Sequence, residues 1–179
     1  MKNRPLLITI TGTESTGKST LVEALAAHYK TTFVPDISRI YLANLNIAYT
    51  EQDVLAIARQ IIIQEDKSLA ECKHLLFSDN DLINIKIWLQ YYQWQIPNWL
   101  TNAITKRKSD LYLICNIDLP WVADAQRKNE DDRQELLNQF TSELAKNNCN
   151  FKMIQGKINQ RTQHAIAQLN NFLDSSILQ

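Results

Sequence analysis

Residues 12–19 have the side chains and the spacing that could bind the phosphates of a nucleotide. Their sequence, GTESTGKS, fits the pattern G-x-x-x-x-G-K-[ST] at every required position. The two glycines would let successive backbone N–H groups converge on an anion. Lys18 would reach the β- and γ-phosphates, and the Ser19 hydroxyl would bind Mg²⁺. We therefore predict an ATP phosphate site formed by Gly12, Thr13, Glu14, Ser15, Thr16, Gly17, Lys18, Ser19 and Thr20.

Two aspartates further along the chain could hold the metal ion or contact the substrate. Asp79 ends an apolar run, and a carboxylate at that position could bind Mg²⁺ beside Ser19. Asp81 lies two residues on and could do this instead, or could contact the substrate. Either aspartate could equally cap the helix that follows. We assign Ser19 and Asp79 to the metal and Asp81 to the substrate.

Asp36 and Arg39 could serve the group that receives the phosphate. Asp36 follows a short apolar run, and a carboxylate there could orient an acceptor hydroxyl and accept its proton. Arg39 lies one helical turn away and could hold a substrate oxygen or neutralise phosphate charge. The alternative is a helix-capping aspartate with an exposed arginine beside it.

Arginines and tryptophans supply the remaining candidates. Arg127 and Arg133 lie in a polar segment that could form a lid over about residues 120–134, excluding water and neutralising charge during transfer. The same residues are also typical of a solvated helix start. Trp88 and Trp121 could stack on a heteroaromatic ring, especially a cationic one, although tryptophans at helical spacing more often pack in the core.

The pattern of elements predicts how these residues are positioned. Apolar, β-branched runs predict strands over residues 5–11, 31–35, 74–79, 111–115 and 151–154. Helices are expected over residues 18–29, 36–45, 50–71, 82–94, 97–106, 135–147 and 159–173. This alternation predicts an α/β fold: a five-stranded parallel sheet with helices on both faces. Ligands of such sheets bind beyond the carboxyl ends of the strands, so we expect the candidate residues to converge there.

Composition limits the classes of function. A length of 179 residues suits one domain over residues 1–179. The 19 basic and 19 acidic residues balance, so the net charge does not favour binding to nucleic acid or to an anionic membrane. No apolar run is long enough to span a bilayer. The three cysteines are scattered without metal-ligand spacing, which favours reduced thiols in a cytoplasmic protein. We therefore expect a small molecule as the partner.

Several motifs together resemble the ribosylnicotinamide kinase domain of the NadR-type NAD-biosynthesis proteins. They are the loop at residues 12–20, VPDISRIYL at 34–42, LLFSDNDL at 75–82 with KIW at 86–88, and the segment at 110–124 that contains LPWVAD. The resemblance implies a P-loop fold like that of nucleoside and nucleotide kinases, with a small lid. It implies transfer of the ATP γ-phosphate, with Mg²⁺, to the 5′-hydroxyl of nicotinamide riboside. Carried over by position, Lys18 and Ser19 would bind the phosphates and Mg²⁺, and Asp79 would lie on the substrate and metal side. Asp36 would face the ribose, and Arg127 would act from the lid.

Three positions depart from that family pattern. Asp36 stands where the family more usually has Glu, Asn80 where Thr is frequent, and Ala125 where a Gly is common. Well-known members also carry an adenylyltransferase domain upstream, and some a DNA-binding domain before it. Since 179 residues hold neither, we expect a kinase that stands alone.

Two other functions are compatible with the same loop. One is a kinase for another nucleoside or nucleotide, and the other is a regulatory P-loop ATPase without a phosphoryl acceptor. A GTPase would need an Asn-Lys-x-Asp loop, whereas the residues after the fourth predicted strand are Asn116, Ile117 and Asp118, without the lysine.

Overall fold

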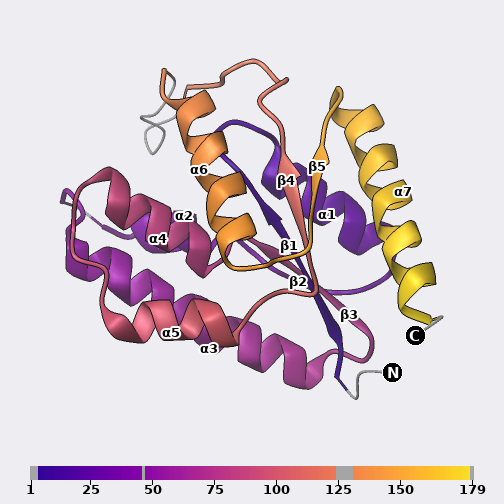
Figure 1. The fold of residues 1–179 in the computed structure, drawn as a ribbon, viewed down its shortest axis with the longest axis horizontal. Helices are drawn as coiled ribbons and strands as arrows, with labels where there is room; N and C mark the ends of the chain where they lie inside the picture. Colours follow the sequence, from indigo (N-terminus) through magenta and orange to yellow (C-terminus); the bar gives the residue numbers. More distant parts are fainter. Residues whose placement is uncertain (1–3, 46, 124–130, 178–179) are drawn as a thin grey trace.

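The computed structural model describes residues 4–45, 47–123 and 131–177, in which strands and helices alternate (Figure 1). The strands are β1 (Leu6–Thr11), β2 (Phe33–Val34), β3 (Leu75–Asp79), β4 (Leu111–Cys115) and β5 (Phe151–Ile154). The helices are α1 (Lys18–His28), α2 (Ile37–Ala43), α3 (Glu51–Glu71), α4 (Leu82–Tyr91), α5 (Asn98–Lys106), α6 (Arg133–Lys146) and α7 (Ile158–Ile177).

The strands form one sheet in the order β2-β3-β1-β4-β5, and every neighbouring pair is parallel. The prediction of a five-stranded parallel sheet is confirmed. β1 lies at the centre, so the loop that follows it emerges at the middle of the carboxyl edge. At the sheet edge, β2 pairs with β3 through only Phe33 and Val34, and is therefore shorter than the predicted strand at residues 31–35.

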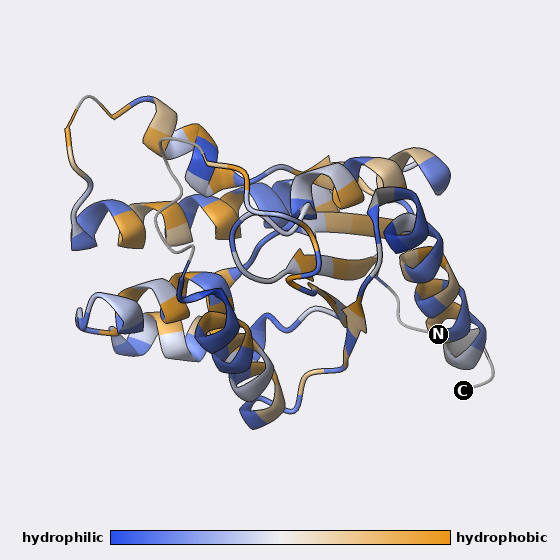
Figure 2. Ribbon diagram, turned by 90° about the horizontal axis from the view of Figure 1, so that it is seen from above, coloured by the Kyte–Doolittle hydropathy of each residue, from blue (hydrophilic) through white to orange (hydrophobic). Residues whose placement is uncertain are grey.

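Helices cover both faces of the sheet because alternate strand residues point to opposite sides. Ile8, Ile10 and Phe77 pack with α1 and α7 on one face. Leu7 and Leu76 pack with α3, α4, α5 and α6 on the other. Figure 2 shows the hydrophobic strands lying between helices that carry both hydrophobic and hydrophilic residues.

Local sequence signals explain where several helices begin and end. Thr50 and Asp53 form a reciprocal capping box at the start of α3, as the predicted helix start requires. α4 ends at Tyr91, three residues before its predicted end, because Gln93 has a left-handed backbone with φ of 55°. Within the described residues, no helix combines the length and the apolar character that a membrane span requires.

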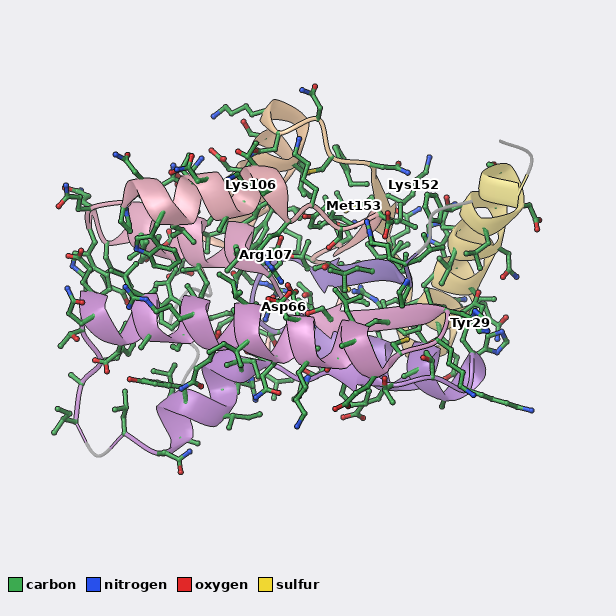
Figure 3. All side chains as sticks on the ribbon, turned by 90° about the horizontal axis from the view of Figure 1, so that it is seen from below. Tyr29, Asp66, Lys106, Arg107, Lys152 and Met153 are labelled. Atoms are coloured by element: carbon green, nitrogen blue, oxygen red, sulfur yellow. The ribbon has the colours of Figure 1, made fainter. Side chains whose placement is uncertain are left out.

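Contacts between side chains hold the helical layer together. Arg107, which follows α5, donates to the Asp66 carboxylate on α3 at 2.5 Å, and Figure 3 shows the two side chains facing each other. On the opposite side of α4, the Lys86 ammonium lies 2.6 Å from the buried Glu143 carboxylate of α6. These ion pairs join helices that cover one face of the sheet.

Candidate active site

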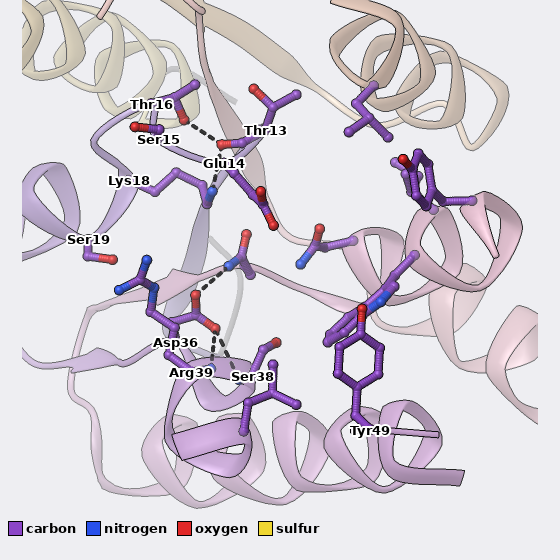
Figure 4. A pocket seen from close by; sticks show the side chains of 18 of the residues that line it. Thr13, Glu14, Ser15, Thr16, Lys18, Ser19, Asp36, Ser38, Arg39 and Tyr49 are labelled. Atoms are coloured by element: carbon purple, nitrogen blue, oxygen red, sulfur yellow. Dashed lines mark hydrogen bonds between the residues drawn. The ribbon is translucent and has the colours of Figure 1, made fainter. Parts of the chain in front are cut away.

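A cavity of about 630 Å³ lies at the carboxyl edge of the sheet. All nine residues predicted to bind phosphates line it, and residues of α2, α4 and α6 line it as well. Figure 4 shows the loop side chains, from Thr13 to Ser19, facing Asp36, Ser38 and Arg39 across the cavity. The cavity therefore lies beyond the carboxyl ends of the strands, where the alternation of elements predicts it.

The backbone of residues 12–19 has the conformation that an anion-binding loop needs. Gly12 has a φ of 127°, and a Cβ atom there would lie 2.9 Å from the Cys115 carbonyl oxygen of β4. Gly17 has a φ of 75° and is the N-cap of α1, so the helix begins directly at the loop. The Lys18 ammonium donates to the Thr13 carbonyl at 2.8 Å, and the Thr16 hydroxyl donates to the same oxygen at 2.8 Å. These bonds hold Lys18 over the loop.

Asp79 and Ser19 fit a magnesium ion. Asp79 is 4% exposed, and its Oδ1 has no hydrogen-bond partner among the described residues. Burial raises the pKa of Asp79 to about 6, although the Lys18 ammonium and the Ser19 hydroxyl act to lower it. A buried carboxylate oxygen without a hydrogen-bond partner, beside a loop hydroxyl, is a suitable ligand for Mg²⁺.

Asp36 is both a helix cap and a cavity residue. Its Oδ1 accepts from the backbone N–H groups of Ser38 at 3.0 Å and Arg39 at 3.3 Å, at the start of α2. Its Oδ2 accepts from the Asn80 side-chain amide at 3.2 Å. The helix-cap interpretation of Asp36 is therefore confirmed, and its role toward an acceptor hydroxyl stays a prediction. Arg39 lines the same cavity from an exposed position.

Aromatic side chains form the wall of the cavity away from the phosphate loop. Trp88, Tyr49, Tyr91 and Tyr92 line it, and the Tyr49 ring meets the Trp88 ring edge-on with centroids 5.1 Å apart. The Tyr49 hydroxyl donates to the Tyr92 hydroxyl at 2.7 Å. Burial is the main cause that raises the pKa of Tyr49. The three tyrosines were not predicted, although the aromatic run after Trp88 was a signal for two of them.

The structure places two predicted substrate residues, Asp81 and Trp121, outside the cavity lining. Asp81 caps α4, accepting from the Asn84 backbone N–H at 3.1 Å, and faces a small second cavity with Glu65. The reason is the left-handed backbone of Asn80, with φ of 76°, which turns the chain after Asp79. Trp121 lies beside the Arg133 guanidinium, whose carbon is 5.7 Å from the ring centroid.

Residues from the predicted lid contact the phosphate loop at Ser15. The Val122 backbone N–H donates to the Ser15 hydroxyl at 2.8 Å. The Arg133 guanidinium donates to the Ser15 carbonyl at 3.4 Å and to the Leu119 carbonyl at 3.2 Å. The predicted catalytic Arg127 lies in the range 124–130, outside the described residues.

Arg161 supports the phosphate loop from behind, whereas its position after the fifth predicted strand suggests a place beside the nucleotide base. Its side chain is 2% exposed and donates to the carbonyl oxygens of Thr16 at 2.6 Å, Gly156 at 3.2 Å and Asn116 at 3.2 Å. It also pairs with the Asp118 carboxylate. Arg161 therefore joins the phosphate loop to the carboxyl ends of β4 and β5.

A family model described as an AAA domain matches residues 7–161, most of the chain. The chain therefore belongs to the AAA domain family. It is 27% identical over 156 residues to the trifunctional NAD biosynthesis/regulator protein NadR of Escherichia coli (strain K12). That match covers 83% of this chain and 38% of the relative, so the chain spans well under half of the NadR protein.

Solved structures give the same fold. A crystal structure of NadR protein in complex with NR superposes with a TM-score of 0.79 at 20% identity, covering 94% of this chain and 49% of that one. Thymidylate kinase from Ehrlichia chaffeensis superposes with a TM-score of 0.64 at 18% identity, covering 93% of this chain and 99% of that one. The fold is thus that of the P-loop nucleoside and nucleotide kinases, and the resemblance to NadR-type proteins is confirmed.

Proposed function

We propose that this protein is an ATP-dependent kinase that phosphorylates the 5′-hydroxyl of nicotinamide riboside to give nicotinamide mononucleotide. The observation that carries this proposal is that one cavity joins three kinds of group. Figure 4 shows Asp36 facing the phosphate loop and Tyr49 on the side of the cavity away from the loop, and Asn80 and Trp88 line the same cavity. Similarity to NadR, one structure of which was solved with NR, supports the same acceptor.

In this proposal the residues of the cavity divide the reaction between donor and acceptor. Lys18 and the loop N–H groups hold the β- and γ-phosphates. Ser19 and Asp79 would hold Mg²⁺, which would supply positive charge beside these phosphates. The Asp36 carboxylate orients the acceptor hydroxyl and takes its proton. The hydroxyl oxygen forms a bond to the γ-phosphorus while the bond from that phosphorus to the β,γ-bridging oxygen breaks, leaving ADP. Arg133, and Arg127 in the proposed lid, would neutralise charge during transfer.

The aromatic wall suits a flat, positively charged base. The faces of Trp88 and Tyr49 attract a cationic ring such as the pyridinium of nicotinamide riboside. Arg39 lines the cavity on the acceptor side and can hold a substrate oxygen. The three free cysteines fit a reducing compartment, and we expect the protein in the cytoplasm.

A kinase for another nucleoside or a nucleotide is the second candidate, favoured by the fold shared with thymidylate kinase. The test is ADP release by the purified protein with ATP and Mg²⁺, with and without nicotinamide riboside, and with mass detection of the mononucleotide. Other nucleosides, thymidine and thymidylate serve as competing acceptors. ADP formed without any phosphorylated product would instead identify a regulatory ATPase.

Lys18→Ala is the matched negative control for that assay. Loss of its charge should lower transfer by roughly 10²–10³-fold for any acceptor. Lys67→Ala, at an exposed position on α3, should leave activity unchanged. Product formation by Lys18→Ala at the wild-type rate would show that a contaminating kinase is being measured.

A further inference from the structure

The side-chain amide of Asn80 contacts Asp36, the proposed general base, and also carries an oxygen that has no hydrogen-bond partner among the described residues. Its side chain is 4% exposed and lines the cavity, and its amide donates to Asp36 Oδ2 at 3.2 Å. An ionised carboxylate only accepts hydrogen bonds, so the amide nitrogen must face Asp36 and the amide oxygen must face away. That oxygen, Oδ1, has no partner among the described residues.

The backbone of Asn80 is fixed on both sides, which fixes the direction of its side chain. Its N–H donates to the Ile10 carbonyl of β1 at 2.9 Å, and its carbonyl accepts from the Ser78 hydroxyl at 3.0 Å. Its φ of 76° is left-handed, a conformation that asparagine tolerates better than most residues. The amide is therefore held in place before any ligand binds.

Ser38 presents a second unused polar atom on the other side of Asp36. The side chain is 8% exposed and lines the cavity, and its Oγ has no partner within the described residues. Its backbone N–H donates to Asp36 Oδ1 at 3.0 Å, so Ser38 and Asn80 hold the two oxygens of one carboxylate (Figure 4). Buried polar atoms without partners are costly, and a ligand hydroxyl would satisfy both of these.

We propose that Asn80 positions Asp36 through its amide N–H, and that Asn80 Oδ1 and Ser38 Oγ bind a ribose hydroxyl of the acceptor other than the one phosphorylated. This inference rests on the proposed function, because it needs a riboside as acceptor. It also gives a physical account of two departures from the family pattern. The side chain of Asp36 is shorter than that of Glu, and the side chain of Asn80, longer than that of Thr, donates to its carboxylate.

The inference predicts selection between ribosides and their deoxy analogues. A site built to bond a hydroxyl rejects an analogue that lacks it, since its own polar groups are then left unpaired. The wild-type protein should therefore phosphorylate nicotinamide riboside with a higher kcat/KM than its 2′-deoxy or 3′-deoxy analogue. Removing Asn80 Oδ1 or Ser38 Oγ should reduce the ratio of kcat/KM for the riboside to kcat/KM for its deoxy analogue.

The variants are chosen to keep the backbone intact. Asn80→Gly accepts the left-handed φ without strain, and Ser38→Ala keeps the N–H that bonds Asp36. We expect Ser38→Ala to raise the KM for the riboside by roughly 3- to 10-fold, with the KM for ATP unchanged. Asn80→Gly should lower kcat as well, because Oδ2 of Asp36 loses the amide that donates to it. Asn102→Ala, an exposed asparagine on α5, is the control for folding and should behave as wild type.

The outcomes separate the two proposals. A wild-type protein that phosphorylates no riboside overturns the proposed function and this inference with it. A wild-type protein that is active, with the riboside-to-deoxyriboside ratio unchanged in both Asn80→Gly and Ser38→Ala, overturns this inference alone. A smaller ratio in either variant, with the KM for ATP unchanged, supports it.

Discussion

At the scale of single residues, Asp36 must be tested in a way that separates catalysis from capping. Asparagine caps helices about as well as aspartate, so Asp36→Asn should leave the melting temperature close to that of wild type. It removes the proton acceptor, and turnover should fall by roughly 10²–10⁴-fold while the KM for ATP is unchanged. Steady-state kinetics with nicotinamide riboside and thermal unfolding give both quantities.

The control for this substitution is Asp174→Asn on the exposed side of α7, which should change neither quantity. Full activity of Asp36→Asn would reduce Asp36 to a helix cap. A large loss of melting temperature would show that the charge of Asp36, and not only its shape, is needed at the start of α2.

Residue types alone predicted the cavity residues of the phosphate loop far better than those on the side proposed for the acceptor. The phosphate loop is one continuous stretch, so its order in the sequence is also its order in space. The acceptor side depends on pairs far apart in the chain, such as Asp36 and Asn80, 44 residues apart. Asp81 shows the limit of prediction from residue type, because the left-handed residue before it turns its side chain away from the cavity.

At the scale of elements, local patterns were sufficient for the sheet and for most helix starts. Apolar runs bounded by polar residues gave β1, β3, β4 and β5 within about one residue, and the strand-end rule gave the position of the cavity. Periodicity cannot reveal which polar residue is buried between elements. In the hydrophobic pattern of α7, Arg161 is one more polar position, yet in the structure the loops after β1, β4 and β5 bury it.

Arg161 should therefore control ATP binding through the shape of the phosphate loop. Arg161→Lys keeps the charge but cannot donate to three carbonyls and a carboxylate at once. We expect the KM for ATP to rise by roughly tenfold and the free energy of unfolding to fall by about 2 kcal/mol. Nucleotide titrations and denaturant unfolding measure the two effects.

Arg59→Lys is the matched control, since Arg59 is exposed on α3 and lies over the Trp99 ring. It should leave the KM for ATP unchanged. If Arg161→Lys lowers stability but leaves the KM for ATP at the wild-type value, then Arg161 stabilises the fold without positioning the loop.

At the scale of the whole molecule, three buried carboxyl groups make stability depend on pH. Burial is the main cause that raises the pKa of Glu65 to about 7 and those of Asp79 and Asp81 to about 6. The charge of Asp81 raises the pKa of Glu65 further, while Arg107 and the Ser78 hydroxyl lower it. Asp53 has the opposite tendency, because its hydrogen bonds to Thr50 and Tyr41 lower its pKa.

The sign of the pH effect follows from which state holds the protons. Between about pH 4 and pH 7 the unfolded chain releases protons that these three groups keep in the folded state, so stability is lost as pH rises. For Glu65 alone the loss between pH 5.5 and pH 8 should be about 2 kcal/mol. Denaturant unfolding at a series of pH values, with EDTA and without nucleotide, should therefore show a lower free energy of unfolding at pH 8 than at pH 5.5.

Glu65→Gln isolates the largest contribution, because glutamine keeps a polar group beside Ser78 and Arg107 but does not titrate. Its unfolding free energy should decline less steeply with pH than that of wild type, whereas Glu71→Gln at the exposed end of α3 should keep the wild-type slope. Added Mg²⁺ and ATP should raise stability most at pH 8, where Asp79 is ionised and ready for a cation. Stability that rises from pH 5.5 to pH 8, or an unchanged slope in Glu65→Gln, would contradict this account of the buried carboxyl groups.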